Sequence, residues 1–485
     1  MGNMLKNQEP FIHLFHTCGS YYAFDVNTNS IIKMGKKNYD LLKLMQKDEL
    51  QASDDELKPF LERMQHKGFF SSNKVKEILH PATNYLDSYL GTELQLICLQ
   101  VTQQCNLRCD YCVYSGKYEN RSHSKARMSF DTAKKSIDFL IEHSENVERV
   151  NIAFYGGEPI LEFELLKKCI LYTLDAAEGK EVGFNLTTNG TLFTKEIIEF
   201  FMEHDVKVMI SLDGPKELHN KNRKFAVSGC GSFDQICDNL KLVKENYESF
   251  FKNNISFNVV LDGENDFACI DNFFASYDVI KDSMVKASYI SENYAKFEMD
   301  PKEENDIKTN YEVFKMYLNK LNRMDSQNIS KLVQQRYDYI RQELSDARYM
   351  TNGLKEQAHP GGPCIPGNLR LFIDVNGTFY PCERVDENSE VMKIGNLEEG
   401  FDFEKVKRIL NVGQITEDNC KNCWAFNFCT SCAAVADDNG QLSASKKLKK
   451  CNIVKYSVER NIKDYCILRE HGHSFDNIDF YIAEE

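Results

Sequence analysis

Short apolar runs alternate with longer amphipathic segments through the middle of the chain. Residues 94–101 carry apolar side chains on both faces of an extended strand, which is typical of a strand buried in a parallel sheet. Residues 129–143 place apolar side chains on one helical face behind the N-cap residue Ser129. Further strand-like runs occur at about 148–155, 182–188, 206–212, 255–261 and 284–290. These strands with crossover helices predict an α/β fold, a partial TIM-type parallel barrel.

The segments on either side of this barrel have patterns of their own. Residues 11–32 alternate in short runs around an Asn27–Ser30 turn, and helical stretches follow at about 37–47 and 54–67. This order predicts a small antiparallel sheet followed by helices. Residues 300–350 are charged and amphipathic, as in a helical linker. We therefore divide the chain into an α+β part at 1–90, the barrel at 91–295, the linker at 296–355 and a cysteine-rich part at 356–485.

Charge and hydropathy narrow the class of protein. The 59 basic and 73 acidic residues leave a net charge of −14, which would repel the phosphate backbone of a nucleic acid. No apolar run approaches the roughly 18 residues of a membrane span, and the first residues lack the apolar core of a signal peptide. We expect a cytoplasmic protein whose partners include neither nucleic acid nor membrane. The 17 cysteines then point to metal binding, because a reducing compartment disfavours disulfides.

Three cysteines, Cys105, Cys109 and Cys112, form a C-x3-C-x2-C run directly after the first predicted strand. A structural zinc site needs four closed ligands, whereas a cubane iron–sulfur cluster held by three cysteines keeps one iron open. A zinc loop that borrows a distant fourth ligand remains the alternative. Loops after the strands form the catalytic face of an α/β barrel. Three more of these loops carry polar or glycine-rich sequences, at Tyr155-Gly156-Gly157-Glu158-Pro159, Thr187-Thr188-Asn189-Gly190 and Ser211-Leu212-Asp213-Gly214-Pro215.

The run from Cys105 to Cys112, with Tyr111 before its last cysteine, and the sequence Gly156-Gly157-Glu158-Pro159 resemble the radical S-adenosylmethionine (SAM) superfamily over roughly residues 93–295. The resemblance implies a [4Fe–4S] cluster on the three cysteines, whose open iron binds SAM. Cys105, Cys109 and Cys112 are therefore the candidate catalytic residues. The resemblance also implies that a set of residues contacts SAM, namely Tyr111, Gly156, Gly157, Glu158, Asn189, Ser211, Asp213 and Arg223.

The C-terminal cysteines resemble the auxiliary-cluster extension of the same superfamily, the SPASM domain. By this resemblance one cluster is held by Cys420, Cys423, Cys429 and Cys451, and a nearer one by Cys364, Cys382 and Cys432. The spacing from Cys429 to Cys432 is one residue shorter than usual in the family. The expectation is three [4Fe–4S] clusters in all, with an open iron in the nearer auxiliary one; a zinc-ribbon tail is the alternative. The other cysteines are expected to be buried small hydrophobic residues: Cys18, Cys98, Cys169, Cys230, Cys237, Cys269 and Cys466.

Residues 1–90, with short strands and then helices, resemble the winged-helix-like element with which peptide-modifying enzymes recognise the leader of a precursor peptide. A leader would then add a strand at the edge of the small sheet. The alternatives are a structural cap and a DNA-binding winged helix. The last is disfavoured because residues 37–67 mix Lys with Asp and Glu and show no basic stripe.

Together these features predict a radical SAM maturase of the sactipeptide or ranthipeptide type, which joins cysteine sulfur to carbon by thioether bonds in a ribosomally made precursor peptide. The expected chemistry starts from a 5′-deoxyadenosyl radical, and the open auxiliary iron would deprotonate a substrate thiol by binding it. The expected partners are a precursor peptide with a leader and a one-electron reductant of the flavodoxin or ferredoxin type. Carbon–carbon crosslinking and sulfatase-type formylglycine formation are the enzymatic alternatives. A metal-bound peptide-binding protein is the non-enzymatic one.

Overall fold

A ten-stranded sheet organises the computed structural model, which describes residues 9–47, 49, 57–119, 121–298, 303–346, 353–361, 363–475 and 481–483. Each of the six predicted barrel strands is confirmed, and each runs parallel to its neighbours. In spatial order they are β12 (Val285–Tyr289), β11 (Ile255–Leu261), β9 (Lys207–Ser211), β8 (Glu181–Thr188), β7 (Arg149–Gly156) and β5 (Leu96–Thr102). Because the strands are parallel, the loops that follow them meet at one edge of the sheet.

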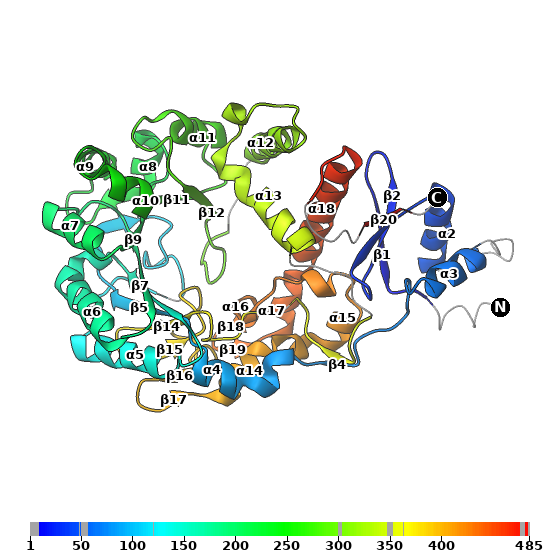
Figure 1. The fold of residues 1–485 in the computed structure, drawn as a ribbon, viewed down its shortest axis with the longest axis horizontal. Helices are drawn as coiled ribbons and strands as arrows, with labels where there is room; N and C mark the ends of the chain where they lie inside the picture. The colour runs from blue at the N-terminus through cyan, green and yellow to red at the C-terminus, as the bar shows by residue number, and fades with distance from the viewer. Residues whose placement is uncertain are drawn as a thin grey trace.

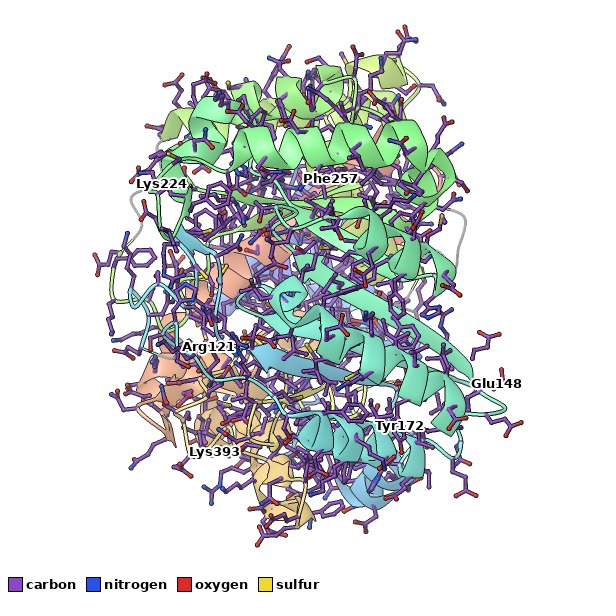
Figure 2. The ribbon with its side chains drawn as sticks, turned by 90° about the vertical axis from the view of Figure 1, so that its left-hand side faces the viewer. Arg121, Glu148, Tyr172, Lys224, Phe257 and Lys393 are labelled. Atoms are coloured by element: carbon purple, nitrogen blue, oxygen red, sulfur yellow. The ribbon has the colours of Figure 1, made fainter. Side chains whose placement is uncertain are left out.

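Helices between the strands cover the outer face of this sheet, so the curved sheet and its helices form an open barrel (Figure 1). The helices are α5 (Phe130–Glu142), α6 (Phe163–Ala176), α7 (Lys195–Glu203), α9 (Phe233–Asn246) and α11 (Phe267–Ser276). The predicted cap is confirmed, because Ser129 Oγ accepts the backbone N–H of Thr132 at 3.0 Å. Figure 2 views the molecule from this helix-covered side.

The sheet continues beyond the barrel into the cysteine-rich part of the chain. Strand β14 (Leu371–Ile373) pairs parallel with β5, placing Phe372 opposite Cys98. The chain then turns back through β15 (Thr378–Tyr380), β16 (Gly395–Asn396) and β17 (Gly400–Phe401), which are antiparallel. The two parts therefore share one mixed sheet and one hydrophobic core. The sequence did not predict this pairing.

The predicted N-terminal sheet is confirmed as three antiparallel strands, β1 (Ile12–His16), β2 (Tyr21–Asp25) and β3 (Ser30–Met34). Its side chains alternate between two cores: Ala23 and Ile32 pack with the following helices, whereas Phe24 and Ile31 belong to the main core. The helices are α2 (Lys36–Gln46) and α3 (Leu57–His66); the predicted start of the second, at 54, lies outside the described residues. An unpredicted strand, β20 (Tyr481–Ala483), pairs parallel with β3.

The linker contains helices, as predicted, and irregular segments join them. It contains α12 (Glu303–Lys320) and α13 (Gln334–Arg341), and α13 packs against the long helix α18 (Cys451–Glu470). Helix α18 also reaches the N-terminal sheet, where Glu459 Oε2 lies 3.0 Å from His13 Nε2. In Figure 1, α18 stands between the barrel and that sheet, so one helix joins the two ends of the chain.

The isolated cysteines divide into two kinds, which corrects part of the prediction. Cys98, Cys169, Cys237 and Cys466 are buried as expected, but Cys18, Cys230 and Cys269 are exposed. The exposed three occupy the turn after β1, a loop before α9 and the first turn of α11. Apolar neighbours in sequence did not bury them because each faces away from the core. In the described part of the chain, no helix is long and apolar enough to cross a membrane.

Candidate active site

The three-cysteine loop follows β5 at the edge where the barrel strands end. Its short strand β6 (Leu107–Cys109) pairs antiparallel with β10 (Arg223–Phe225), which sets Cys109 opposite Arg223. Burial raises the pKa of the Cys105 thiol to about 12 and also raises that of Cys109, and the cysteine charges raise the pKa values further. The thiols are therefore protonated at neutral pH and would lose their protons on binding a metal.

Two glycines bring the loop after β7 into backbone contact with the segment that leads to Cys105. A Cβ on Gly156, whose φ is +140°, would lie 2.0 Å from Thr102 O, and one on Gly157 would lie 2.1 Å from the carbonyl oxygen of Gln104. The backbone N–H groups of Gly157 and Glu158 donate at 2.9 Å to Thr102 O and Gln104 O. Only glycine allows this approach at both positions, so the two loops form one backbone platform.

We expect Gly157→Ala to disrupt this platform. The added Cβ has only backbone neighbours inside 3 Å, so the two loops must separate, at a cost of about 1–3 kcal/mol. SAM affinity of the iron-loaded protein should fall by roughly tenfold or more, as 1.4 kcal/mol corresponds to a factor of ten. Equilibrium SAM binding measures this. Gly91→Ala is the control, because no atom lies within 4 Å of its Cβ position; equal SAM affinity of the two variants would contradict the prediction.

Glu158 connects the loops that follow β7, β8 and β5. Its buried carboxylate accepts hydrogen bonds from Ile160 N at 3.0 Å, Thr188 Oγ1 at 2.7 Å and Asn189 N at 2.7 Å. Burial raises the pKa of Glu158 to about 7, although the three hydrogen bonds favour its ionised form. Asn189 Nδ2 in turn donates to Asn106 Oδ1 at 2.8 Å and lies 3.8 Å from Cys105 Sγ. The chain Glu158–Asn189–Asn106 thus fixes the position of the first cysteine.

Asp213, Arg223 and Tyr111 form a buried charged unit behind the cysteine loop. Arg223 Nε and Nη2 donate to the Asp213 carboxylate at 2.8 and 3.2 Å, and the Tyr111 hydroxyl donates to the same carboxylate. Burial raises the pKa of Asp213, but the Arg223 charge outweighs it and leaves the pKa below its usual value. The Arg223 guanidinium also lies 5.3 Å from the centre of the Tyr111 ring. This unit holds Tyr111, which lies between Cys109 and Cys112, in place. Ser211, the half-buried last residue of β9, lies beside Asn258 of β11 and outside the unit.

Sequence reasoning missed a second buried ion pair, which joins the barrel to the cysteine-rich part. Arg121 Nε lies 2.5 Å from Glu387 Oε1, and both side chains are almost fully buried. Gln100 of β5 donates to the same carboxylate at 2.8 Å and to the Tyr114 hydroxyl at 2.8 Å. The partners are far apart in sequence, and neither has a local pattern that could have identified it.

The C-terminal cysteines gather in two sets. Burial raises the pKa of Cys364 and of Cys382, and in both cases the charge of Cys432 raises it further. The pKa values of Cys423 and Cys451 are raised mainly by burial. The charges of Cys420 and Cys429 raise both values further. The second set therefore comprises Cys420, Cys423, Cys429 and Cys451. These are the sets that the resemblance implies; their binding of iron stays a prediction.

Two residues near the set of Cys364, Cys382 and Cys432 are candidates for the fourth ligand of that set. His359, upstream of Cys364, is buried, and its Nε2 accepts the N–H of Gly413 at 2.8 Å, so that nitrogen is already used. Cys98 of β5 is buried, and the charge of Cys382 is among the causes that raise its pKa after burial itself. Cys98 is thus an extra thiol that the structure brings near Cys382.

The donor set of the cysteine loop fits an iron–sulfur cluster. Within the described ranges, no three His, Cys, Asp or Glu side chains converge as a single metal ion requires. Each cysteine of a cubane binds a different iron, so its thiols surround a volume instead of meeting at a point. Three half-buried thiols on a loop tied by hydrogen bonds at a barrel edge fit such a group, and Gly156 and Gly157 hold the neighbouring loop against the segment that leads to Cys105.

A cleft at the same edge extends from the cysteine loop across the barrel mouth. One cavity of about 370 Å³ is lined by Tyr111 and Asp262, among others, and an adjoining one of about 480 Å³ by Asp262, Tyr289 and Lys450. The strand-ending sequence Leu261-Asp262-Gly263 repeats the pattern at Asp213 and could have identified this part. Tyr289 and Lys450 carry no such signal. The two cavities share Asp262 and Gly263, which follow Leu261, so together they run from the cysteine loop to the ends of β11 and β12.

Comparison with known proteins identifies the class. Residues 99–271 match the family described as the Radical SAM superfamily. The chain is 25% identical over 387 residues, 76% of its length and 95% of the relative, to the cysteine-type anaerobic sulfatase-maturating enzyme of Clostridium perfringens. It is 24% identical over 273 residues, 53% of its length and 56% of the relative, to the radical SAM cyclopropyl synthase TigE of Paramaledivibacter caminithermalis. A solved structure described as native anSMEcpe with bound AdoMet shares the fold, with a TM-score of 0.58 at 20% identity over 78% of this chain and 99% of that one.

These matches support the radical SAM class and the fold, but they do not identify the substrate. Residues 99–271 match the Radical SAM superfamily, and the chain is similar to the sulfatase-maturating enzyme and the cyclopropyl synthase of that superfamily. The match spans 37% of an uncharacterised relative from Methanocaldococcus jannaschii and little more than half of TigE. The radical SAM class and the α/β fold of the prediction are thus confirmed, while the substrate, the winged-helix element and the auxiliary clusters stay predictions.

Proposed function

We propose that the protein is a radical SAM maturase that forms thioether crosslinks in a cysteine-containing precursor peptide. The observation that carries the proposal is the pair of C-terminal cysteine sets, four thiols in one and three in the other, beside a radical SAM domain. Seven such cysteines exceed what one radical SAM cluster requires. The open cleft at the barrel mouth, lined by Asp262, Tyr289 and Lys450, accommodates a peptide segment.

In this reaction the two groups of cysteines and the residues that support them have different roles. Cys105, Cys109 and Cys112 would hold a [4Fe–4S] cluster, which with bound SAM supplies a 5′-deoxyadenosyl radical that removes a hydrogen atom from the substrate. Asn189 and the Asp213–Arg223 pair keep the cysteine loop in position. Cys364, Cys382 and Cys432 would hold a second cluster, leaving a ligand position for a substrate thiol. A one-electron donor of the ferredoxin or flavodoxin type is the required partner.

The N-terminal sheet is the proposed binding site for the leader. Extended peptides bind by adding a strand to an exposed sheet edge. The outer edge of β3 is paired with β20 through Tyr481 and Ile31, so a leader would bind at β1 or replace β20. A pocket beside β1, lined by Phe11, His13 and Trp424, adjoins the second cysteine set. A leader bound there would lie next to Asn422 and Trp424, the residues on either side of Cys423.

Sulfatase-type maturation, which converts a cysteine to formylglycine, is the second candidate. It is favoured by the similarity to the Clostridium perfringens enzyme, which covers 95% of that relative. It uses the same radical and the same cysteine sets. It differs in its product: the cysteine loses its sulfur, whereas a thioether keeps the sulfur and loses two hydrogen atoms per link. Carbon–carbon crosslinking, the third option, loses two hydrogens but leaves the thiol free for alkylation.

The test begins with metal content. After anaerobic reconstitution we expect about 12 iron atoms per chain, four for each of three clusters, and no stoichiometric zinc. Cys98→Ala should retain all of the iron, because the nearer set is proposed to keep a free ligand position. About four iron atoms with stoichiometric zinc would remove the auxiliary clusters from the proposal. Loss of iron in Cys98→Ala would mean a closed four-cysteine site and would remove the position for a substrate thiol.

The reconstituted protein is then incubated with SAM, a reductant and two peptides. One is a cysteine-rich peptide that carries a leader, and the other is a short cysteine peptide from a sulfatase. Loss of two hydrogens per link from the first, with its thiol protected from alkylation, supports the thioether function. Replacement of thiol by aldehyde in the second supports sulfatase maturation instead. SAM cleavage without a change in either peptide would reject both.

A further inference from the structure

Lys447 is a buried cation without a carboxylate partner in the described part of the chain. It lies on the short helix α17 (Ala444–Lys449) and is 2% exposed. Its neighbours Lys446 and Lys450 pair with Asp438 and Glu292 at the surface. The Lys447 ammonium instead donates to Thr416 Oγ1 at 2.9 Å and lies 3.6 Å from Cys420 Sγ. Burying an ammonium costs several kcal/mol unless an anion compensates it, so a nearby anion is required.

The cysteines of the second set are the groups that can supply that charge. Cys420 is buried beside both Lys447 and the Thr416 hydroxyl, whose oxygen is 3.2 Å from its sulfur. The Cys451 sulfur lies 3.9 Å from the Lys447 carbonyl oxygen. A free cysteine thiol is mostly neutral at pH 7, because the ordinary pKa of the group is about 8.5. Metal binding deprotonates a thiol outright, so the compensating charge arises when the set holds a metal.

We propose that Lys447 is the built-in counter-cation of a metal–thiolate centre held by Cys420, Cys423, Cys429 and Cys451. It is a positioning residue: its N–H donates to the Cys420 sulfur and its charge offsets the thiolates. This inference rests on the proposed auxiliary centre and adds to it a residue that sets the stability and redox potential of the metal. Lys455, half-buried on α18, adds a second positive charge near Cys423 and Cys451.

The proposal predicts opposite effects in the metal-free and metal-loaded protein. Without metal, the Lys447 ammonium is uncompensated, so Lys447→Met should raise the thermal midpoint of the chelator-treated protein. With metal, the same variant removes the charge and the N–H···S contact. We then expect metal affinity at this set to fall by roughly 10- to 100-fold, the usual cost of losing a residue that supports a metal ligand. The reduction midpoint should shift to more negative potential, because reduction adds an electron to an already anionic centre.

The experiment compares Lys447→Met, Lys447→Gln and the control Lys449→Met after anaerobic reconstitution with Fe²⁺ and sulfide. Lys449 is exposed on the same helix. The readouts are iron per chain in a chelator competition, midpoint potential by EPR-monitored titration, and thermal midpoint without metal. Iron at this set is defined as the amount lost in Cys420→Ser. Weaker iron retention and a more negative potential in both Lys447 variants, but not in Lys449→Met, support the proposal; the Gln variant shows that the charge matters and not only a polar contact.

Three outcomes would overturn the proposal, and they are distinguishable. If the wild type loses iron in Cys420→Ser but both Lys447 variants match Lys449→Met in retention and potential, the counter-cation role fails and the auxiliary centre stands. A lowered thermal midpoint of metal-free Lys447→Met would likewise make Lys447 an ordinary structural residue. If Cys420→Ser loses no iron, the set holds no cluster, and the auxiliary centre of the proposed function fails together with this inference.

Discussion

Replacing Cys105, Cys109 or Cys112 by alanine should abolish reductive cleavage of SAM to methionine and 5′-deoxyadenosine. The three residues lie on one loop at the edge where the barrel strands end, and each would supply one iron ligand. Loss of one thiolate leaves a second iron open, so the cluster would no longer hold SAM in a single orientation. We expect turnover below detection, a loss of at least about a thousandfold, or about 4 kcal/mol of transition-state stabilisation. Chromatography of 5′-deoxyadenosine measures it.

A matched control separates this effect from thiol loss in general. Cys230→Ala removes an exposed cysteine from the loop before α9 and should leave SAM cleavage unchanged. The iron content of each variant shows whether the auxiliary sets remain loaded, since they use other cysteines. Any of the three variants that still cleaves SAM at the wild-type rate would refute the assignment of the cysteine loop.

Asp213→Asn should destabilise the folded protein more than any surface charge replacement. It leaves the Arg223 guanidinium buried without its anion, and breaking one side of a buried pair costs about 3–5 kcal/mol. Arg223 lies across from Cys109 in the β6–β10 pairing, so the variant should also lose iron from the first cluster. Urea unfolding of the metal-free protein measures the free energy. Asp234→Asn, which breaks the exposed pair with Lys216, is the control and should cost less than about 1 kcal/mol.

The buried Asp213–Arg223 pair should also make the free energy of unfolding depend on pH. The pKa of Asp213 is lowered in the folded state, so its ionised form stabilises the fold above the unfolded pKa, about 3.9. That contribution is lost as pH falls below about 4 and through the lower folded pKa. Wild-type unfolding free energy should therefore fall steeply in this acidic range, and Asp213→Asn should show a shallower loss. Equal unfolding free energies of Asp213→Asn and Asp234→Asn at neutral pH would contradict the role of the buried pair.

Several features were determined by the sequence alone because they depend on local pattern. Alternating or continuous apolar runs identified every parallel barrel strand, and Ser129 identified the start of α5. Parallel strands with crossover helices have few topologies open to them, so the barrel class and the shared edge for the loops followed. The cysteine spacing and the sequence Gly156-Gly157-Glu158-Pro159 identified the radical SAM class for the same reason: the ligands of one cluster lie on one short loop.

Only the tertiary structure decided the pairings between distant parts of the chain. Strand β14 joins the barrel at β5, β20 joins β3, and Arg121 meets Glu387; none of these pairs is favoured by a local period. Asp213 and Arg223 were predicted as separate SAM contacts, yet they bind each other and Tyr111 behind the cysteine loop. Lys447 resembles its neighbouring lysines in sequence and differs only in being buried. A residue's charge can be read from its identity, but the cost of that charge depends on the atoms that folding places around it.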